Sequence, residues 1–324
     1  MTLYGKTAQS RLIRTMAARE QLPHAMLICG EEGTGRRTLA HFTAMAALCT
    51  GQDKPCGTCL HCRKIEGGIH PDVIEVEHSG KLQGFSVDTV RRICREAIVA
   101  PNDGARKIYL FTDCDRMDVR AQNTLLKLTE EPPPHVLLLF TAKHRHALLE
   151  TMRSRMMILP VGPCSREAHR EALLAQGCSA GEADAAYEAC GGNIGRSLRW
   201  LHDAGMQEMT ANAARLTTAL AVRDAYEILR LLSVYEKDRQ EACSFLMLLE
   251  RQLRDALALK FEAQDMIGCD RSSAKALSEA VTSGRAARMH AAVQEAYEAL
   301  QANVSVRLAL AALGGSLLSD TERK

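Results

Sequence analysis

The sequence predicts an α/β domain with a parallel sheet at residues 1–162, followed by two all-α domains at residues 163–205 and 206–324. Five short apolar runs occur in the first domain, and stretches with helical patterning separate them. Continuous apolar runs of this length indicate strands that are buried on both faces of a parallel sheet. The composition changes after Pro160, and no strand-like run follows it.

Length and composition support a multidomain globular protein. The chain has 324 residues, which favours two or three domains, and it is 46% hydrophobic and 25% charged. A net charge of +2 argues against a nucleic-acid-binding surface that covers the whole molecule. The chain lacks an apolar run of about 18 residues and an N-terminal signal core, so we expect a cytoplasmic protein whose twelve cysteines are reduced.

The order of the predicted elements follows from these patterns. The runs expected to form strands are 25–29, 73–76, 107–112, 136–140 and 156–159. Helices are expected at 38–49 and 119–131, the second ended by a run of three prolines. From residue 165 we expect short helices with breaks at Gly177 and at Gly191-Gly192. Longer helices should then follow, with weak breaks near Gly268 and Gly284.

The turn after the first predicted strand has the glycine spacing of a phosphate-binding loop. Residues 30–38 read G-E-E-G-T-G-R-R-T, with Gly30, Gly33 and Gly35 as the glycines, against the pattern G-x-x-x-x-G-K-[ST]. Arg36 takes the place of the lysine that contacts the β- and γ-phosphates. Arg37 takes the place of the hydroxyl that holds Mg²⁺, and Thr38 comes one residue too late on the helix.

The acidic motif of a hydrolysing enzyme is also altered. The third predicted strand ends in Asp113-Cys114-Asp115, so Asp113 takes the metal position and Cys114 replaces the expected base. Asp115 could be an ordinary helix cap. Two independent defects favour a loop that does not hydrolyse nucleotide. A plain turn, nucleotide binding without turnover, and hydrolysis remain the three interpretations.

Four cysteines have the spacing of a metal site. Cys49, Cys56, Cys59 and Cys62 form C-x6-C-x2-C-x2-C, and four thiolates with no open position are typical of structural Zn²⁺. An iron–sulfur cluster is an alternative, but the further C-x3-C-P step is missing after Cys62. A second alternative is that the four cysteines bind no metal and pack in the core. His61 and His70 are additional possible ligands.

The chain resembles the AAA+ clamp-loader family of bacterial replication, in which a P-loop turn precedes a four-cysteine knuckle. Further similar segments are 68–72 (G-I-H-P-D), 123–133 (N-T-L-L-K-L-T-E-E-P-P, similar to N-A-L-L-K-x-L-E-E-P-P), 151–155 (T-M-R-S-R, similar to T-I-x-S-R-C) and 303–310 (N-V-S-V-R-L-A-L, similar to the collar helix). The resemblance covers essentially the whole chain.

The resemblance implies an AAA+-like P-loop domain with an inserted zinc knuckle at 49–62, a small helical lid at 163–205 and a helical collar at 206–324. The gamma/tau ATPase of this family keeps the lysine and an adjacent D-E pair. This chain lacks both and is similar to the non-hydrolysing subunit. The implied partners are the gamma/tau and delta subunits in a ring of five, with the sliding clamp and primed DNA reached through the assembled ring.

The resemblance also implies roles for individual arginines. Arg155 stands where the family places an arginine finger, which acts in trans on the ATP of a neighbouring gamma/tau subunit. Arg153 occupies the variable position of that motif, and the alternative for Arg155 is an ordinary pair with a nearby acid. The family's ATP-sensing arginine aligns with Gly195, and Arg196 lies one position later. The resemblance implies that the protein is part of a polymerase holoenzyme, but no segment of this sequence resembles a polymerase active site.

Two functions from other classes stay open. An independent P-loop ATPase would have to work despite Arg36, Arg37 and Cys114. A zinc-knuckle nucleic-acid binder would use basic residues near the cysteines. Those residues are Lys54, Arg63, Lys64 and Lys81.

Overall fold

The computed structural model describes residues 2–76, 78, 84–261 and 270–319. Lys81, the predicted break near Gly268 and residues 320–324 of the chain lie outside the described residues. Two compact units make up the chain, Met1–Cys164 and Ser165–Lys324. Among the described helices, none is long and apolar enough to cross a membrane.

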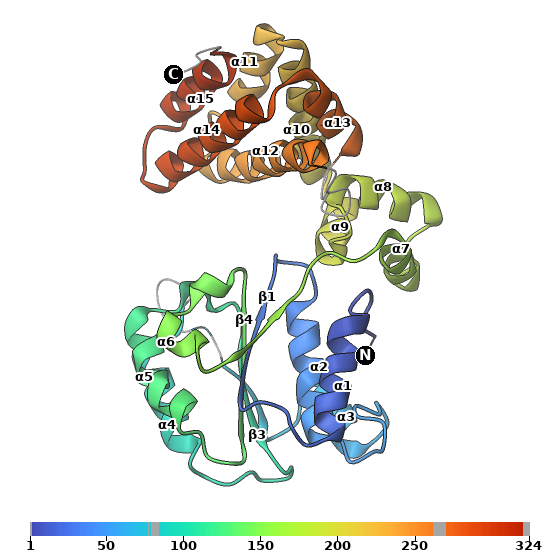
Figure 1. Cartoon of the computed structure of the whole chain (residues 1–324), viewed down its shortest axis with the longest axis vertical. Helices are drawn as coiled ribbons and strands as arrows, with labels where there is room; N and C mark the ends of the chain where they lie inside the picture. Colours follow the sequence, from blue (N-terminus) through green and yellow to red (C-terminus); the bar gives the residue numbers. More distant parts are fainter. Residues whose placement is uncertain (1, 77, 79–83, 262–269, 320–324) are drawn as a thin grey trace. The chain divides into compact units, whose positions relative to one another are not determined.

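The first unit is built on a parallel sheet of five strands, as the apolar runs predict (Figure 1). The strands are β1 (Ala25–Cys29), β2 (Val73–Val76), β3 (Lys107–Phe111), β4 (Val136–Ala142) and β5 (Met157–Pro160). Their order is β2-β3-β4-β1-β5, and each neighbouring pair is parallel. All five predicted runs therefore form strands; β1 and β2 have the predicted bounds, and the ends of the other three differ by one or two residues.

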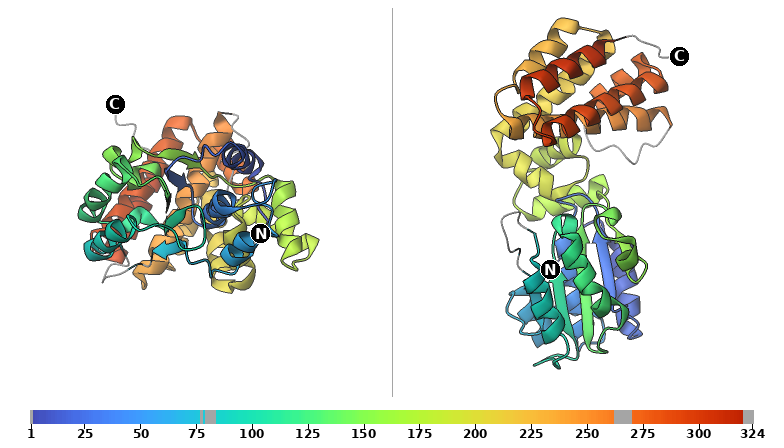
Figure 2. Two further views of the ribbon diagram at one scale, coloured as in Figure 1. Left: turned by 90° about the horizontal axis from the view of Figure 1, so that it is seen from below. Right: turned by 90° about the vertical axis from the view of Figure 1, so that its left-hand side faces the viewer.

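Helices cover both faces of this sheet, which explains why the central strands have no polar face (Figures 1 and 2). The helical segments are α1 (Thr7–Ala18), α2 (Arg36–Leu48), α3 (Leu60–Glu66), α4 (Val87–Glu96), η1 (Cys114–Arg116), α5 (Val119–Glu130), η2 (Arg145–Ala147) and α6 (Glu150–Arg153). In β1, Met26 and Ile28 pack with Leu39 of α2, whereas Leu27 packs with Leu125 of α5. Alternate residues of the same strand thus belong to different cores.

The strand order places two loops at one edge of the sheet. β4 lies between β1 and β3, and all three are parallel, so the loops that follow β1 and β3 leave from the same edge. In open α/β sheets this carboxyl edge is where ligands bind. The glycine-rich turn and Asp113 are both found there.

The second unit is helical throughout its described residues, in agreement with the predicted all-α character. Its helices are α7 (Arg166–Ala175), α8 (Ala180–Cys190), α9 (Ile194–His202), α10 (Ala204–Val222), α11 (Ala225–Ser233), α12 (Arg239–Lys260), α13 (Arg271–Ala280), α14 (Ser283–Gln301) and α15 (Val306–Leu318). The predicted breaks at Gly177 and Gly191-Gly192 occur, and another lies just before Gly284. Breaks after α10, α11 and α14 were not predicted.

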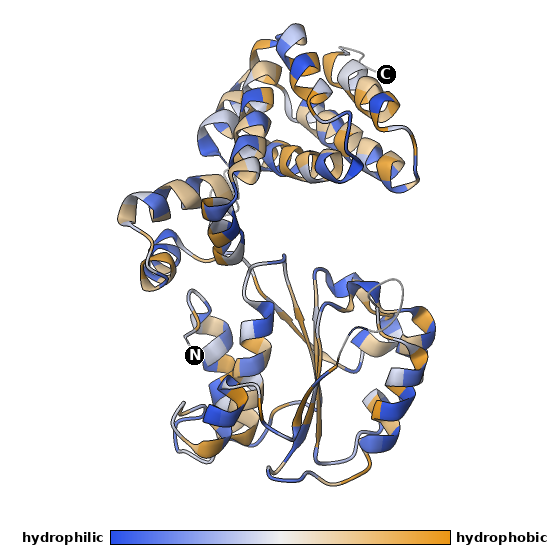
Figure 3. Cartoon of the chain, turned by 180° about the vertical axis from the view of Figure 1, so that it is seen from behind, coloured by the Kyte–Doolittle hydropathy of each residue, from blue (hydrophilic) through white to orange (hydrophobic). Residues whose placement is uncertain are grey.

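Two separate apolar clusters stabilise these helices. A small cluster formed by α7–α9 contains Leu173 and Ala186, and a large one formed by α10–α15 contains Leu249 and Leu313. The alternation of apolar and polar residues along the helices is visible in Figure 3. Both clusters lie within the one compact unit Ser165–Lys324, so the boundary between two helical domains at 205 stays a prediction.

A buried histidine joins the three helices of the small cluster. His169 of α7 is fully buried, and its Nε2 lies 2.7 Å from Ser197 Oγ of α9. Its ring also meets the ring of Tyr187 of α8 edge-on. Burial, with the Arg166 charge as a second cause, lowers the pKa of His169 to about 4. The folded protein therefore holds this imidazole neutral at physiological pH.

We predict that acid destabilises α7–α9 through His169. The unfolded chain binds a proton at the ordinary histidine pKa of about 6.5, whereas the folded state binds it only near pH 4, so stability falls as the pH drops between these values. The expected loss between pH 7 and pH 4 is about 2–3 kcal/mol. Amide hydrogen exchange in α7 and α9, corrected for intrinsic rates, measures it.

The matched variants are His169→Gln, which keeps a donor for Ser197 but does not titrate, and His202→Gln, on the exposed side of α9. The first should flatten the pH dependence and the second should leave it unchanged. If the stability of His169→Gln depended on pH as strongly as that of the unmodified protein, the acid sensitivity would come from other groups.

Candidate functional site

The glycine-rich turn keeps the shape of a phosphate-binding loop for reasons within the chain itself. A Cβ on Gly30 would lie 2.0 Å from the carbonyl oxygen of Val161, so a side chain cannot fit there. Gly33 and Gly35 have φ values of 86° and 90°, in the left-handed region that favours glycine. The hydroxyl of Thr34 donates back to the Glu31 carbonyl at 2.7 Å.

Arg36 spans the gap between the two loops at this edge. Its side chain is 5% exposed, and its Nη2 donates to Asp113 Oδ1 at 2.8 Å. Nη1 lies 3.9 Å from Asp115 Oδ2 and makes no hydrogen bond within the described residues. The cation in the lysine position and the carboxylate in the metal position thus neutralise each other.

Arg37 is held in a different direction. Its guanidinium forms an ion pair with Glu75 on the edge strand β2, and both side chains are exposed. Thr38 is half-buried in the first turn of α2. The cation in the hydroxyl position is therefore also matched by an acid of this chain.

The side chain in the position of the catalytic base faces the interior. Cys114 is fully buried, its thiol donates to the Phe111 carbonyl at 3.3 Å, and burial raises its pKa well above the ordinary value. Asp115 accepts the Lys143 N–H at 2.7 and 2.9 Å. Asp115 therefore ties the loop after β3 to the loop after β4 and does not cap the short helix that contains it.

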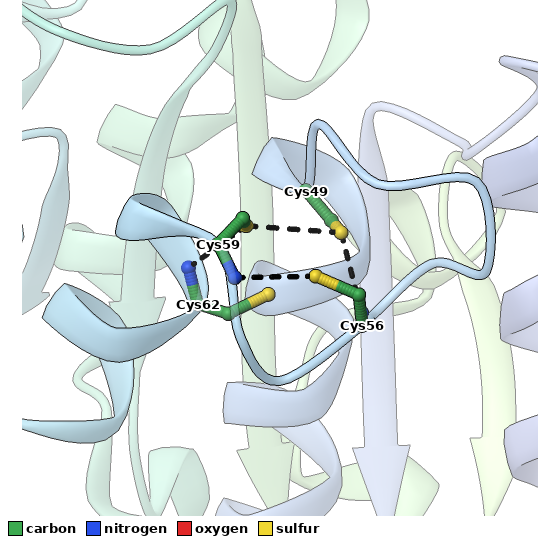
Figure 4. A group of neighbouring side chains, drawn as sticks. All are labelled: Cys49, Cys56, Cys59 and Cys62. Carbon is green, nitrogen blue, oxygen red and sulfur yellow. Dashed lines mark hydrogen bonds between the residues drawn. The ribbon is translucent and has the colours of Figure 1, made fainter.

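The four cysteines meet in a loop between α2 and α3, as Figure 4 shows. Their sulfur atoms all lie within 4.8 Å of one another, and the Sγ atoms of Cys49 and Cys59 are 3.9 Å apart. In a tetrahedral zinc site with Zn–S bonds of about 2.3 Å, sulfurs lie about 3.8 Å apart. The donor set and spacing fit a metal ion with four thiolate ligands.

Backbone N–H groups converge on the sulfurs. The N–H groups of Gly51 and Cys56 donate to Cys49 Sγ, and that of Cys59 donates to Cys56 Sγ, each at 3.3 Å. Cys59 Sγ also caps α3 by accepting the Cys62 N–H. Such donors stabilise negative charge on sulfur.

The thiol pKa values divide the four cysteines into two pairs. Hydrogen bonds from Thr58 and Cys59 lower the pKa of Cys56 to about 5. Burial opposes but does not overcome the N–H bonds that lower the pKa of Cys59. Burial raises the pKa of Cys49 and Cys62. Since thiolates are the metal ligands, Cys49 and Cys62 must release their protons when a metal binds.

The two histidines beside the cysteines belong to a second cluster. His61 Nδ1 and His70 Nε2 are 2.9 Å apart, and both lie near the Asp103 carboxylate. The Asp72 N–H donates to His70 Nδ1, so the proton of a neutral His70 is on Nε2, which faces His61. This arrangement leaves His70 no lone pair for a metal in that cluster, and the histidines act as a hydrogen-bonded support for the knuckle.

A buried carboxylate holds that support to the sheet. Asp72 is fully buried and accepts the N–H groups of Asn102, Asp103 and Gly104 at 2.6–2.7 Å. Burial alone would raise the pKa of Asp72, but these donors outweigh it and the pKa is lowered. Lys64 of α3 pairs with Asp103 at 2.5 Å, so one of the basic residues near the knuckle is matched by an acid.

Arg155 lies in the first unit, just after α6. Its Nη2 is 2.9 Å from Glu130 Oε1, and its Nη1 donates to the Thr151 carbonyl at 2.6 Å. Its side chain is 39% exposed. Arg153 instead turns its Nε toward the Leu148 carbonyl. The predicted alternative, a pair with a nearby acid, is thus present, and it leaves the guanidinium accessible.

The structure brings Arg36 of the loop and Asp113 together, brings the four cysteines together, and pairs Arg155 with Glu130 of α5. Reasoning from the sequence missed three acids that matter, Asp72, Glu75 and Glu130. Asp72 and Glu130 lie in segments noted for their family resemblance, which was the available signal. Glu75 lies in an apolar run where an acid marks an exposed position, and nothing in the sequence pairs it with Arg37.

Comparisons with known proteins identify chains of similar sequence. Residues 5–165 match the family described as DNA polymerase III, delta subunit. The chain is 30% identical over 172 residues to the delta-prime subunit of DNA polymerase III from Bacillus subtilis, a match that covers 52% of this chain and 51% of that one. It is 32% identical over 152 residues to the tau subunit from the same organism, covering 46% of this chain and 26% of the relative.

The matched region spans about half the length of the delta-prime relative and about a quarter of the tau relative. Among solved structures, a gamma subunit-related protein of DNA polymerase III from Thermotoga maritima is 18% identical. The superposition covers 97% of this chain and 98% of that chain, with a TM-score of 0.41.

The parallel sheet and the glycine-rich turn at its carboxyl edge define a P-loop α/β domain of the AAA+ kind, with a four-cysteine insertion. More specifically, residues 5–165 belong to the family described as DNA polymerase III, delta subunit, and this part of the chain is 30–34% identical to delta-prime subunits.

We predict that the two arginine pairs of the loop differ in their contribution to stability. Asp113→Asn should lower the free energy of unfolding of the first unit by about 1–3 kcal/mol, because it removes the hydrogen-bonded anion of the buried Arg36 charge and leaves only the Asp115 carboxylate, 3.9 Å away. Glu75→Gln should change it by less than about 0.5 kcal/mol, because both partners of that pair are exposed. Urea titration of the full chain, followed by exchange of the β3 and α2 amides, measures both. Equal effects would contradict the structural role given to the Arg36–Asp113 pair.

Proposed function

We propose that this protein is the delta-prime subunit of a DNA polymerase III clamp loader, a ring subunit that does not hydrolyse ATP itself. The family match supports the assignment to the clamp loader. The single observation that supports the absence of hydrolysis is the Arg36–Asp113 ion pair. In a working site those two positions hold a phosphate-binding lysine and a ligand of Mg²⁺.

The proposal extends to assembly. The gamma/tau and delta subunits would complete the ring, which would load the sliding clamp on primed DNA. Residues 206–324 would form the collar of that ring, and residues 163–205 the lid. The separate apolar clusters of α7–α9 and α10–α15 support this division.

A gamma/tau-like subunit that binds or hydrolyses ATP is the second candidate, and the match to a tau subunit favours it. The arrangement of the loop argues against it, because Arg36 and Arg37 are both paired with acids and Cys114 faces the core. A metal-dependent turnover would need an oxygen ligand in the position of Arg37 and an accessible base in the position of Cys114.

We predict that the isolated chain releases no phosphate from ATP above a buffer control. Arg36→Lys with Arg37→Thr restores the loop pattern but should still not create turnover, because Cys114 remains a buried neutral thiol. A phosphate-release assay with an intact gamma/tau subunit as positive control measures this. Turnover by the unmodified chain would favour the second candidate.

We further propose that the four cysteines hold one structural Zn²⁺, which would cross-link the loop between α2 and α3. Their spacing and their N–H donors support a closed four-thiolate site. When bound, the ion supplies folding energy and no reaction chemistry.

We predict about one zinc per chain by metal analysis, and its loss in Cys59→Ser, because the hydroxyl is a poor zinc ligand. The knuckle should lose protection from proteolysis at the same time. Cys94→Ser is the control, since Cys94 is outside the cluster and its thiol donates to the Thr124 carbonyl. Iron–sulfur absorption, or a metal-free chain with intact cysteines, would refute the zinc assignment.

The clamp-loader proposal assigns Arg155 as the arginine finger for a neighbouring gamma/tau site. Its exposure and its place outside this chain's own loop support action in trans. A guanidinium suits the charge that develops on the γ-phosphate oxygens of the transition state.

We predict that Arg155→Ala slows ATP turnover at the neighbouring site by roughly 10³-fold, the lower end of the contribution of arginine fingers. Clamp loading should slow with it, while zinc content and ring assembly stay normal. Single-turnover hydrolysis by the reconstituted ring measures the effect. Arg153→Ala is the control, because Arg153 is turned to the Leu148 carbonyl. A normal hydrolysis rate in Arg155→Ala, or a larger defect in Arg153→Ala, would refute the assignment of Arg155 as the arginine finger.

A further inference from the structure

Glu130 lies at the C-terminal end of α5, where a negative charge is unfavourable unless a cation lies beside it. Glu130 is the last residue of α5, at the end of the helix where carbonyl groups are unpaired and negative charge is disfavoured. Glu131 follows it, so two acids stand at this end. Within the described residues, Glu130 Oε1 lies 2.9 Å from Arg155 Nη2, and Glu130, not Glu131, is the acid that pairs with Arg155.

The backbone that carries Glu130 is fixed. The Thr129 hydroxyl donates to the Leu126 carbonyl at 2.8 Å, and His24 Nε2 lies 3.0 Å from the Thr129 carbonyl oxygen. Thr129 is itself buried. The end of α5 is thereby joined to the start of β1, and Glu130 extends from a rigid part of the sheet domain.

The segment that carries Arg155 is short by comparison. α6 has four residues, and Arg155 follows it by two. The guanidinium is restricted by three acceptors. They are Glu130 Oε1, the Thr151 carbonyl oxygen at 2.6 Å and Ser154 Oγ at 3.1 Å. Two of the three belong to the same local turn, so of these three contacts the one with Glu130 connects Arg155 to another element of the domain.

We propose that Glu130 is a positioning residue for Arg155: it orients the exposed guanidinium before a neighbouring phosphate meets it. This inference rests on the proposed role of Arg155 as an arginine finger. An arginine side chain has many rotamers, and a side chain already held in one orientation loses less entropy when it binds a phosphate. The pair is exposed on both sides, so it is weak enough to yield when a triphosphate approaches.

The test is a double-mutant cycle in the reconstituted clamp loader. Glu130→Ala should lower single-turnover hydrolysis at the neighbouring site by about two- to fivefold, the range expected for an exposed pair. It should leave nucleotide affinity at that site unchanged. Glu130→Gln keeps a hydrogen-bond acceptor without the charge, so its hydrolysis rate should lie between those of the unmodified protein and Glu130→Ala. Because Glu130 acts through Arg155, Glu130→Ala should have no further effect in an Arg155→Ala background.

Glu131→Ala is the matched control, since it removes the adjacent exposed acid without touching Arg155. Ring assembly and zinc content are measured for each variant. An unchanged or faster rate in Glu130→Ala, with Arg155→Ala still defective, would overturn the positioning role and leave the proposed function in place. An equal defect of Glu130→Ala in both backgrounds would also overturn it. No defect in Arg155→Ala itself would refute the arginine finger and, with it, both proposals.

Discussion

The buried guanidinium of Arg36 constrains the whole carboxyl edge of the sheet. It begins α2, where the positive end of the helix dipole disfavours a cation, and it is 5% exposed, so an uncompensated charge would be costly. Asp113 supplies the anion from the end of β3. Because β4 lies between β1 and β3, the pair reaches across the middle of the sheet and joins two loops that are far apart in the sequence.

The same helix is restricted at its other end. α2 ends at Leu48, and Cys49 is both its C-terminal cap residue and the first member of the cysteine cluster. Beyond the cluster, α3 is joined through Lys64 and Asp103 to the loop that Asp72 organises. An ion pair at one end of α2 and a cysteine cluster at the other thus hold the helix through side chains of the chain itself. A domain built this way has its loop conformation supported by its own side chains.

The elements whose physical cause is local were predictable from the sequence. The central strands β1, β3 and β4 are buried along their whole length and are rich in apolar residues, whereas the edge strands β2 and β5 have short, mostly apolar runs, so all five were recognised. The breaks at Gly177 and Gly191 were recognised because glycine in the sequence marks positions where the backbone can take a positive φ, and both glycines do so. The break after α10 was missed because Arg223, and not a glycine, has the positive φ there, and the aspartates that cap α11 and α12 have no glycine beside them. Asp is a strong N-cap residue, and that signal was present in the sequence.

The candidate site was predictable in its members but not in its contacts. Spacing alone identified the four cysteines, because ligands in one loop are necessarily close. Asp113 was recognised for the metal it would hold in a relative, yet its pair with Arg36 depends on strand order, which local patterns do not specify. Glu75 and Glu130 are ordinary acids in the sequence. Their importance comes from the arginines that the fold brings to them.

Arg36 and Arg155 show how burial decides what an arginine can do. Both contact a carboxylate within 3 Å, but one side chain is 5% exposed and the other 39%. Removing the partner of a buried charge is costly, so Arg36 is committed to Asp113. An exposed pair has little net stability, so Arg155 can exchange its carboxylate for another anion at small cost. Under the proposed function, the chain would combine a loop that its own ion pair closes with an arginine free to serve a neighbour. A subunit of that kind would present the same surface through each round of ATP turnover, because its own loop would have no nucleotide state to follow.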